Sequence, residues 1–190
     1  ILSSLPSVVV GLFGYLIFVV QFEYGFSILS GALALTVFNL PQMTRNVEDS
    51  LRHVHHTQRE AGLALGISRW ETVLHVVIPE ALPGIVTGIV LASGRIFGEA
   101  GALIYTAGQS APALDWSNWN PFSVTSPISI FRQSETLAVH IWKVNSEGTI
   151  PDGTLVSAGS AAVLLIFILI FNLAARRIGK VLHKKLTSAQ

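Results

Sequence analysis

The feature that most constrains the fold is an uncharged apolar run near the C-terminus. Residues 155–175 contain no Asp, Glu, Lys or Arg, and Arg176 and Arg177 follow directly. A helix needs about 20 mostly apolar residues to cross a bilayer, so this run predicts a transmembrane helix. Three earlier stretches are also apolar enough to cross: 2–20, 26–43 and 82–105. The sequence therefore predicts an all-α fold, a polytopic transmembrane helical bundle with four spans in a single domain over residues 1–190.

Composition supports a membrane protein. The chain is 51% hydrophobic and 12% charged, whereas a soluble domain carries about 25% charged residues. A net charge of +1 gives no indication of nucleic-acid binding, and the lack of Cys excludes disulfides and thiolate metal sites. The chain opens within an apolar run that no basic residues precede, which is not typical of a signal peptide. We expect further spans before it in a longer gene product.

The distribution of Lys and Arg predicts the orientation, because cytoplasmic connectors are enriched in both. The tail is basic between 176 and 185, whereas residues 106–153 contain only Arg132 and Lys143. The connector between the second and third spans carries Arg45, Arg52, Arg59 and Arg69. We therefore expect 44–80 to be a cytoplasmic loop, 106–153 an extracytoplasmic segment and 176–190 a cytoplasmic tail. The tail is interpreted as a positively charged membrane anchor rather than a specific lipid site.

Residues in the predicted cytoplasmic loop follow a definite spacing. Glu60, Ala61 and Gly62 are followed by three residues and Gly66, and after nine more residues by the run Val76-Val77-Ile78-Pro79. Gly66 suits the left-handed backbone conformation that ends helices. The pattern therefore indicates a short helix that stops at Gly66.

Two helices are expected around this glycine. Asp49 can cap a first helix that runs toward Leu65. Ser68 and Glu71 have the spacing of a capping box, which predicts a second helix from Arg69 to about Val77. The loop should thus be a helix, a tight turn and a helix that leads into the third span.

The pattern resembles the EAA loop of bacterial ABC importer permeases, which reads Glu-Ala-Ala, three residues, Gly, nine residues, Ile-x-Leu-Pro. In that family a short coupling helix lies in a groove of the ATP-binding subunit. The resemblance implies a type I permease fold, with Glu60, Ala61, Gly62 and Gly66 as the ATPase-docking residues. The alternative is a solvated loop in which Glu and Gly are ordinary helix punctuation.

Arg95 and Glu99 are two charges inside the third predicted span. Each costs about 2.5–3.5 kcal/mol near the centre of a bilayer, so both should face protein or water. Their spacing of four places them on one helical face, where they can form an ion pair. Arg95 can give two hydrogen bonds to an oxyanion, so the pair is a candidate for the substrate pathway. The alternative is a buried salt bridge that touches no substrate.

The block around these charges extends the resemblance. Gly94-Arg95, two residues, Gly98-Glu99 and the following run 100–108 are similar to the phosphate importer's inner-membrane permease, the PstA-type subunit. The opening at 6–11 and the run 138–142, late in the predicted outer segment, are similar too. The family has six spans, of which these four would be the last.

This resemblance implies a permease subunit that translocates inorganic phosphate across the bacterial cytoplasmic (inner) membrane. Its implied partners are ATP-binding ABC subunits, a second homologous permease, an extracytoplasmic phosphate-binding protein and membrane lipid, with no nucleic acid and no cofactor. The partner ATPase subunits would hydrolyse ATP, so this chain is expected to be a transport subunit and not an enzyme. A permease for an amino acid, sulfate or phosphonate remains the alternative, and the sequence does not fix the solute.

The sequence admits two other interpretations. His53, His55 and His56 suggest a metal site, but no carboxylate or thiolate partner with catalytic spacing accompanies them. A membrane-embedded enzyme that uses Glu99 or this histidine cluster would need a second carboxylate or His at membrane depth, and the predicted spans offer only Arg95 and Glu99. A solvated histidine cluster is favoured, with no catalytic or metal residues. A pure scaffold protein would need no charge inside the membrane, so Arg95 counts against it.

The glycine pairs and the outer segment add two expectations. The pairs Gly84/Gly88 and Gly94/Gly98 favour close helix packing, and Gly11 with Gly14 is a weaker version of the same signal. In the outer segment, Ser134 and Glu135 indicate a helix start. That segment is expected to receive the binding protein, or only to seal the outer mouth.

Overall fold

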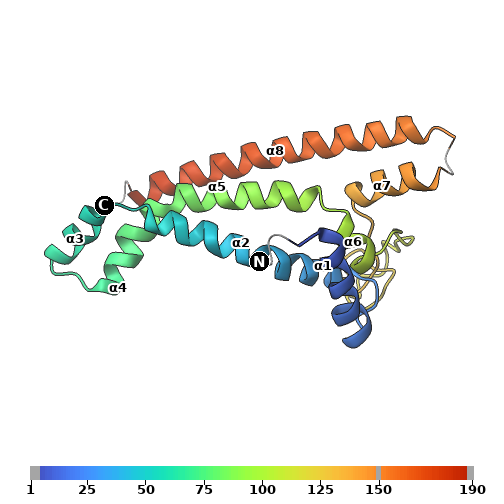
Figure 1. Cartoon of the computed structure of the whole chain (residues 1–190), viewed down its shortest axis with the longest axis horizontal. Coiled ribbons are helices and arrows are strands. Elements are labelled where there is room, and N and C mark those ends of the chain that lie inside the picture. Colours follow the sequence, from blue (N-terminus) through green and yellow to red (C-terminus); the bar gives the residue numbers. More distant parts are fainter. Residues whose placement is uncertain (1–4, 149–150, 188–190) are drawn as a thin grey trace. The chain divides into compact units, whose positions relative to one another are not determined.

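The computed structural model describes residues 5–148 and 151–187, and every regular element within them is a helix, as predicted (Figure 1). The elements include two short π-helical segments, η2 and η3. In chain order they are α1 (Ser7–Gly14), η2 (Tyr15–Gln21), α2 (Ile28–Arg52), α3 (His56–Ala64), α4 (Arg69–Thr72), η3 (Val73–Val77), α5 (Ile78–Phe97), α6 (Gly101–Thr106), α7 (Leu137–Glu147) and α8 (Gly153–Thr187).

Two helical stretches in the described part of the chain are long and apolar enough to cross a membrane, Arg69–Phe97 and Gly153–Lys185. They overlap the third and fourth predicted spans, although the helix of the third span, predicted at 82–105, is interrupted at residues 98–100. The apolar helix Ser7–Gln21 is shorter, and α2 continues to Arg52 through a polar second half. The beginning of the first predicted span at residues 2–4, residues 149–150 of the outer segment and residues 188–190 of the tail lie outside the described residues.

The described residues group into two compact units. The first unit comprises the residues up to Leu40 together with 95–167, and the second comprises 41–94 and the residues from Ile168 onward. Each unit has its own core.

The first unit is centred on α6. Leu103, Ile104, Ala107 and Val139 form its buried apolar cluster. Helix α1 packs directly on α6 through Gly11, where an added Cβ would lie 2.9 Å from the Cα of Ala102. The weaker glycine signal of the sequence therefore marks one of the closest helix contacts of this unit.

The second unit has a cluster of Val54, Val77 and Ala81. In the same unit α5 packs on α2, since a Cβ at Gly84 would lie 2.7 Å from the Ser50 Oγ, and one at Gly88 would lie 3.0 Å from the Asn46 Cβ. The Gly84/Gly88 packing prediction is confirmed.

Gly94 behaves differently from the glycines before it. A Cβ at Gly94 meets no atom within 4 Å in the described part of the chain. The expected packing at Gly94 is therefore not made by this chain's described residues.

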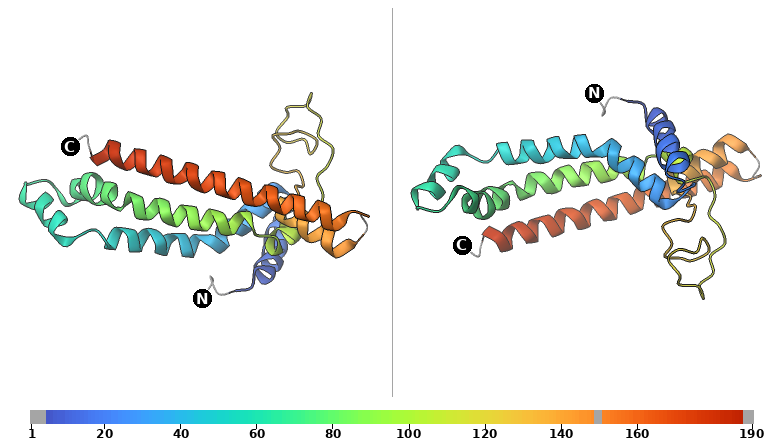
Figure 2. Two further views of the ribbon diagram at one scale, coloured as in Figure 1. Left: turned by 90° about the horizontal axis from the view of Figure 1, so that it is seen from above. Right: turned by 90° about the horizontal axis from the view of Figure 1, so that it is seen from below.

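Residues 107–136 form an irregular segment between α6 and α7, drawn in olive and yellow in Figure 2. Helix α7 begins after Thr136, whose Oγ1 accepts a hydrogen bond from the Val139 N–H at 3.3 Å. The predicted start at Ser134 and Glu135 was wrong by two residues. Glu135 instead contacts the side chain of His140, with its Oε1 2.7 Å from Nδ1.

Candidate functional site

The first helix of the predicted coupling loop begins later than the sequence suggested. Helix α2 continues past Asp49 to Arg52, so Asp49 does not cap the next helix. Glu48 Oε1 lies 2.7 Å from Arg52 Nη2. This ion pair joins side chains one helical turn apart and supports the continuation of α2. Helix α3 starts at His56 and contains Glu60, Ala61 and Gly62, whereas Gly66 lies after its end.

The turn after α3 follows the prediction. Gly66 has φ of +79°, the left-handed conformation that a side chain disfavours. Ser68 and Glu71 form the capping box: the Glu71 N–H donates to the Ser68 Oγ at 3.2 Å, and the Ser68 N–H donates to Glu71 Oε2 at 2.9 Å. From Arg69 the backbone is helical through α4, η3 and α5, so the loop runs directly into the apolar helix.

Gly62 holds the two arms of the loop together. It is buried, and an added Cβ would lie 2.8 Å from the Cγ2 and 3.1 Å from the Oγ1 of Thr72. Thr72 is itself buried and donates a hydrogen bond to the Ser68 carbonyl at 3.0 Å. This contact explains why glycine stands where the EAA pattern has its second Ala.

The other motif residues face outward. Glu60 and Ala61 are exposed, and Glu60 Oε1 lies 3.2 Å from His56 Nδ1, a pair in which both side chains remain largely in solvent. Arg59 turns inward and donates to the Leu51 carbonyl at 2.6 Å. The arginine therefore ties α3 to the end of α2, while Glu60 and Ala61 remain accessible.

Two large apolar side chains on this loop were missed by the sequence interpretation. Leu65 is 82% exposed and Trp70 is 68% exposed, and they flank the Gly66 turn. An exposed apolar surface on a polar loop is typical of a protein interface. The sequence shows a Trp between Arg69 and Glu71 and a Leu directly before Gly66, but it does not indicate that these side chains face outward.

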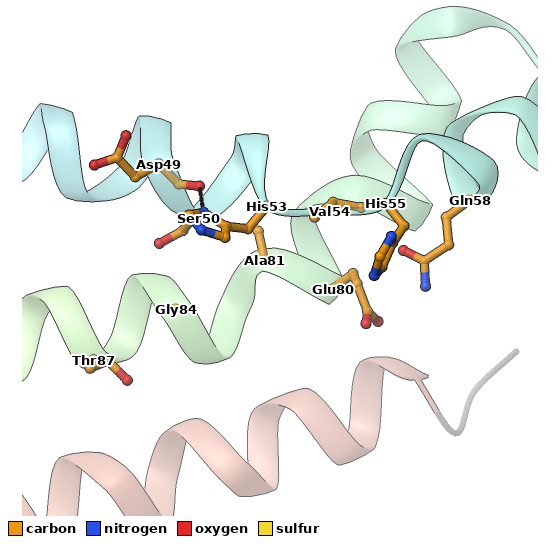
Figure 3. Close-up of a pocket in the computed structure, with 10 residues that line it drawn as sticks. All are labelled: Asp49, Ser50, His53, Val54, His55, Gln58, Glu80, Ala81, Gly84 and Thr87. Atoms are coloured by element: carbon orange, nitrogen blue, oxygen red, sulfur yellow. Dashed lines mark hydrogen bonds between the residues drawn. The ribbon is translucent and has the colours of Figure 1, made fainter.

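The histidines lie beside a hollow of about 410 Å³ in the second unit (Figure 3). His53 and His55 line it with Asp49, Glu80 and Gln58, between the end of α2, the start of α3 and the first turns of α5. His53 Nδ1 lies 2.6 Å from the Asp49 carbonyl oxygen. Within the described residues, no three His, Cys, Asp or Glu side chains are grouped closely enough to hold a metal ion.

In the first unit, the expected helical pairing of Arg95 and Glu99 is wrong. Helix α5 ends at Phe97, and the chain leaves the helix through residues 98–100 before α6 begins. Glu99 lies in this break, where its Oε1 accepts a hydrogen bond from the Ala102 N–H at 3.3 Å. Two glycines in the block 94–98 lower its helix propensity, and the carboxylate satisfies a free donor at the start of α6.

Arg95 has a different neighbour. Its guanidinium carbon lies 4.8 Å from the centre of the Phe38 ring, a cation–π contact between α5 and α2. Its side chain is exposed, and no carboxylate lies within 4.0 Å of it in the described part of the chain. The guanidinium group therefore lies over the ring face and keeps its positive charge.

Comparison with known proteins identifies the family of the chain. Residues 1–188 match the family described as binding-protein-dependent transport system inner membrane component. The chain belongs to this family of transport permeases. The permease is thus an all-α inner membrane transport component, and no solved structure matches it.

Named relatives narrow the comparison. The permease is 58% identical over 188 residues to the probable ABC transporter permease protein YqgI of Bacillus subtilis, which covers 99% of this chain and 64% of the relative. It is 34% identical over 180 residues to the phosphate transport system permease protein PstA 2 of Mycobacterium bovis, covering 94% of this chain and 55% of the relative. It is 36% identical over 180 residues to PstA of Xylella fastidiosa, covering 93% and 56%. The chain therefore spans between about half and two thirds of the length of these relatives.

Proposed function

We propose that the permease translocates inorganic phosphate across the bacterial cytoplasmic membrane as a subunit of an ATP-driven importer. Relatives named as phosphate transport permeases, at 34–36% identity, support this solute. The relative at 58% identity carries no solute in its name. The observation that carries the proposal is therefore Arg95, an exposed cation held on Phe38 and unpaired with any carboxylate among the described residues.

Arg95 is proposed to contact phosphate in the translocation path. Its planar group can give two hydrogen bonds to two oxygens of one anion, and it keeps its charge at every physiological pH. A contact with the ring face of Phe38 leaves this charge in place, whereas a salt bridge to Glu99 would have neutralised it. Glu99 is proposed to have a supporting role. Its hydrogen bond from the Ala102 N–H fixes the start of α6, a few residues after Arg95.

The loop around α3 is proposed to dock on an ATP-binding subunit. Glu60, Ala61 and the Gly66 turn would form the contact together with Leu65 and Trp70, because these residues are exposed. Gly62 would act indirectly by keeping α3 packed on Thr72. A movement of the ATPase would then pass through α3 into the helical stretch Arg69–Phe97.

The remaining partners follow from the same proposal. Basic residues in 44–80 and in the tail support a cytoplasmic location for both, with 106–153 outside. An extracytoplasmic binding protein would deliver phosphate to that outer side, and a second homologous permease would complete the path. ATP binding would open the path outward and hydrolysis would reset it, so the chemistry of ATP belongs to the partner subunits.

The test is radiolabelled phosphate uptake by cells that produce the intact permease with its transport partners. Arg95→Gln should abolish uptake while the ATPase still co-purifies with the membrane complex. Lys184→Gln, which removes one positive charge from an exposed position of the tail, is the matched control and should transport normally.

Each result has a definite meaning. If Arg95→Gln takes up phosphate at the wild-type rate, the proposed contact with the anion is wrong. If the wild-type permease moves no phosphate but moves sulfate, a phosphonate or an amino acid in the same cells, the assignment as an importer permease stands. The assignment of phosphate as its solute is then wrong.

A further inference from the structure

A hollow of about 290 Å³ lies in the second unit between α5 and α8. Three basic side chains line one wall: Arg176, Lys180 and His183. Their spacings of four and three residues place them on the same face of α8. Pro83, Val86 and Thr87 of α5 line the opposite wall.

The two helices approach closely at the base of this hollow. Gly179 is buried, and an added Cβ would lie 2.6 Å from the Cγ1 of Val86. Only a residue without a side chain fits there unless Val86 moves. The hollow is thus formed beside a tight helix contact.

A proline positions the third basic residue. Pro83 has no N–H, so the carbonyl of Pro79 lacks the hydrogen-bond donor that an α-helix supplies four residues later. His183 Nδ1 lies 3.1 Å from that carbonyl oxygen. Since a carbonyl oxygen only accepts, Nδ1 is the donor, and the contact fixes the imidazole ring at the wall of the hollow.

The hollow is positive. None of the residues that line it is acidic. Within 151–187 and the rest of the described chain, neither Arg176 nor Lys180 has a carboxylate within 4.0 Å. The hollow beside His53 differs, because Asp49 and Glu80 contribute carboxylates to its lining.

The position of the hollow along α8 indicates its ligand. The uncharged run 155–175 ends immediately before Arg176, so the hollow begins where the hydrocarbon of a bilayer gives way to headgroups. A phospholipid places its phosphate at this depth. Pro83 and Val86 offer apolar contacts for the glycerol and the upper acyl chain, which a free anion would not use.

We propose that this hollow binds the phosphate of an anionic phospholipid. The tail is then more than a diffuse positive anchor, because three of its basic groups converge on one site. This inference requires that α8 lies in the membrane and does not depend on the solute that the permease transports.

The test measures lipid binding to the intact, delipidated permease in detergent by native mass spectrometry, with dioleoylphosphatidylglycerol as the probe. The double variant Arg176→Gln/Lys180→Gln should weaken binding about 10- to 30-fold, the size expected for losing two basic side chains from an anionic-lipid contact. The double variant Arg177→Gln/Lys184→Gln removes the same charge from exposed positions that do not line the hollow. It should bind within about twofold of wild type, as substitutions outside the contact do.

Further measurements distinguish the phosphate of a lipid from free phosphate and control for misfolding of the variants. Dioleoylphosphatidylcholine should bind far more weakly, and inorganic phosphate at millimolar concentration should not displace phosphatidylglycerol. Each single variant, Arg176→Gln or Lys180→Gln, alters an exposed helix position and is expected to fold. If both double variants lose phosphatidylglycerol binding equally, the proposal is wrong and the basic tail attracts lipid only diffusely. If inorganic phosphate displaces phosphatidylglycerol, the proposal is also wrong and the hollow is a site for a free anion.

Discussion

Arg95 is held by the face of the Phe38 ring and not by Glu99, although Glu99 is only four residues away in the sequence. This arrangement gives the guanidinium group an orientation without neutralising its charge. It predicts that the aromatic ring matters to transport. Phe38→Leu should reduce the affinity for phosphate severalfold, since a cation–π contact contributes about 0.5–2 kcal/mol.

The measurement is the concentration dependence of initial uptake rates. Phe38→Tyr keeps a ring and is the matched control, and it should retain most of the wild-type affinity. An equal loss in Leu and Tyr variants would show that packing at this position, and not the ring face, is what transport requires.

Glu99 provides a test of its hydrogen bond to the start of α6. Glu99→Gln keeps an acceptor for the Ala102 N–H and should melt close to wild type, whereas Glu99→Ala should lose about 1 kcal/mol, the usual cost of an unsatisfied helix-start donor. Thermal unfolding in detergent measures both. If a salt bridge to Arg95 were the important contact, the Gln variant would be as unstable as the Ala variant.

The Gly62–Thr72 contact predicts an unusual dependence on a single methyl group. Gly62→Ala restores the EAA pattern but should destabilise the loop by about 1–3 kcal/mol, the cost of overpacking. Adding Thr72→Ala removes both crowding atoms and should recover most of that loss. The four proteins of this double-mutant cycle are compared by thermal unfolding and by ATPase co-purification, and simple additivity of the two effects would contradict the contact.

Trp70 should contribute strongly to ATPase docking. Trp70→Ala is expected to weaken co-purification of the ATP-binding subunit more than about tenfold, since buried interface tryptophans are frequent hot spots. Trp116→Ala is a matched control because Trp116, in the predicted outer segment, is 69% exposed and Trp70 is 68% exposed. Equal behaviour of the two variants would remove the loop's apolar surface from the proposed interface.

Asp115 gives a prediction about pH. Hydrogen bonds from the Ser117 hydroxyl at 2.6 Å and from its N–H at 3.0 Å lower the pKa of this carboxyl below its ordinary value. A lowered folded-state pKa stabilises the turn fully above the unfolded pKa, and the effect is lost as pH falls through the folded value. NMR titration of the labelled carboxyl carbon should show the low pKa, and Ser117→Ala should raise it toward an ordinary aspartate.

The features that could be predicted from the sequence depend on neighbouring residues. The Ser68–Glu71 capping box and the Gly66 turn each involve a few consecutive residues, and both are present as expected. The apolar runs predicted at 82–105 and 155–175 overlap the two long helical stretches Arg69–Phe97 and Gly153–Lys185, because hydropathy is a property of the run itself.

The features that were missed depend on competition between alternative local structures or on contacts with residues far away in the sequence. Asp49 is a good helix cap, but the Glu48–Arg52 pair and the preceding turns of α2 favour continuing the helix. Arg95 and Glu99 have helical spacing, but a break at 98–100 separates them, and Phe38 is fifty-seven positions earlier in the numbering. No local pattern indicates which distant side chain will lie against a guanidinium group.

The exposed Leu65 and Trp70 also have a consequence for biogenesis. A chain synthesised before the proposed ATP-binding subunit is available presents both side chains to water, together with the adjacent turn. In that interval it is most open to proteolysis and to association with other chains. If the proposed subunit covers this surface, balanced synthesis of the two should determine how much permease survives in the cell.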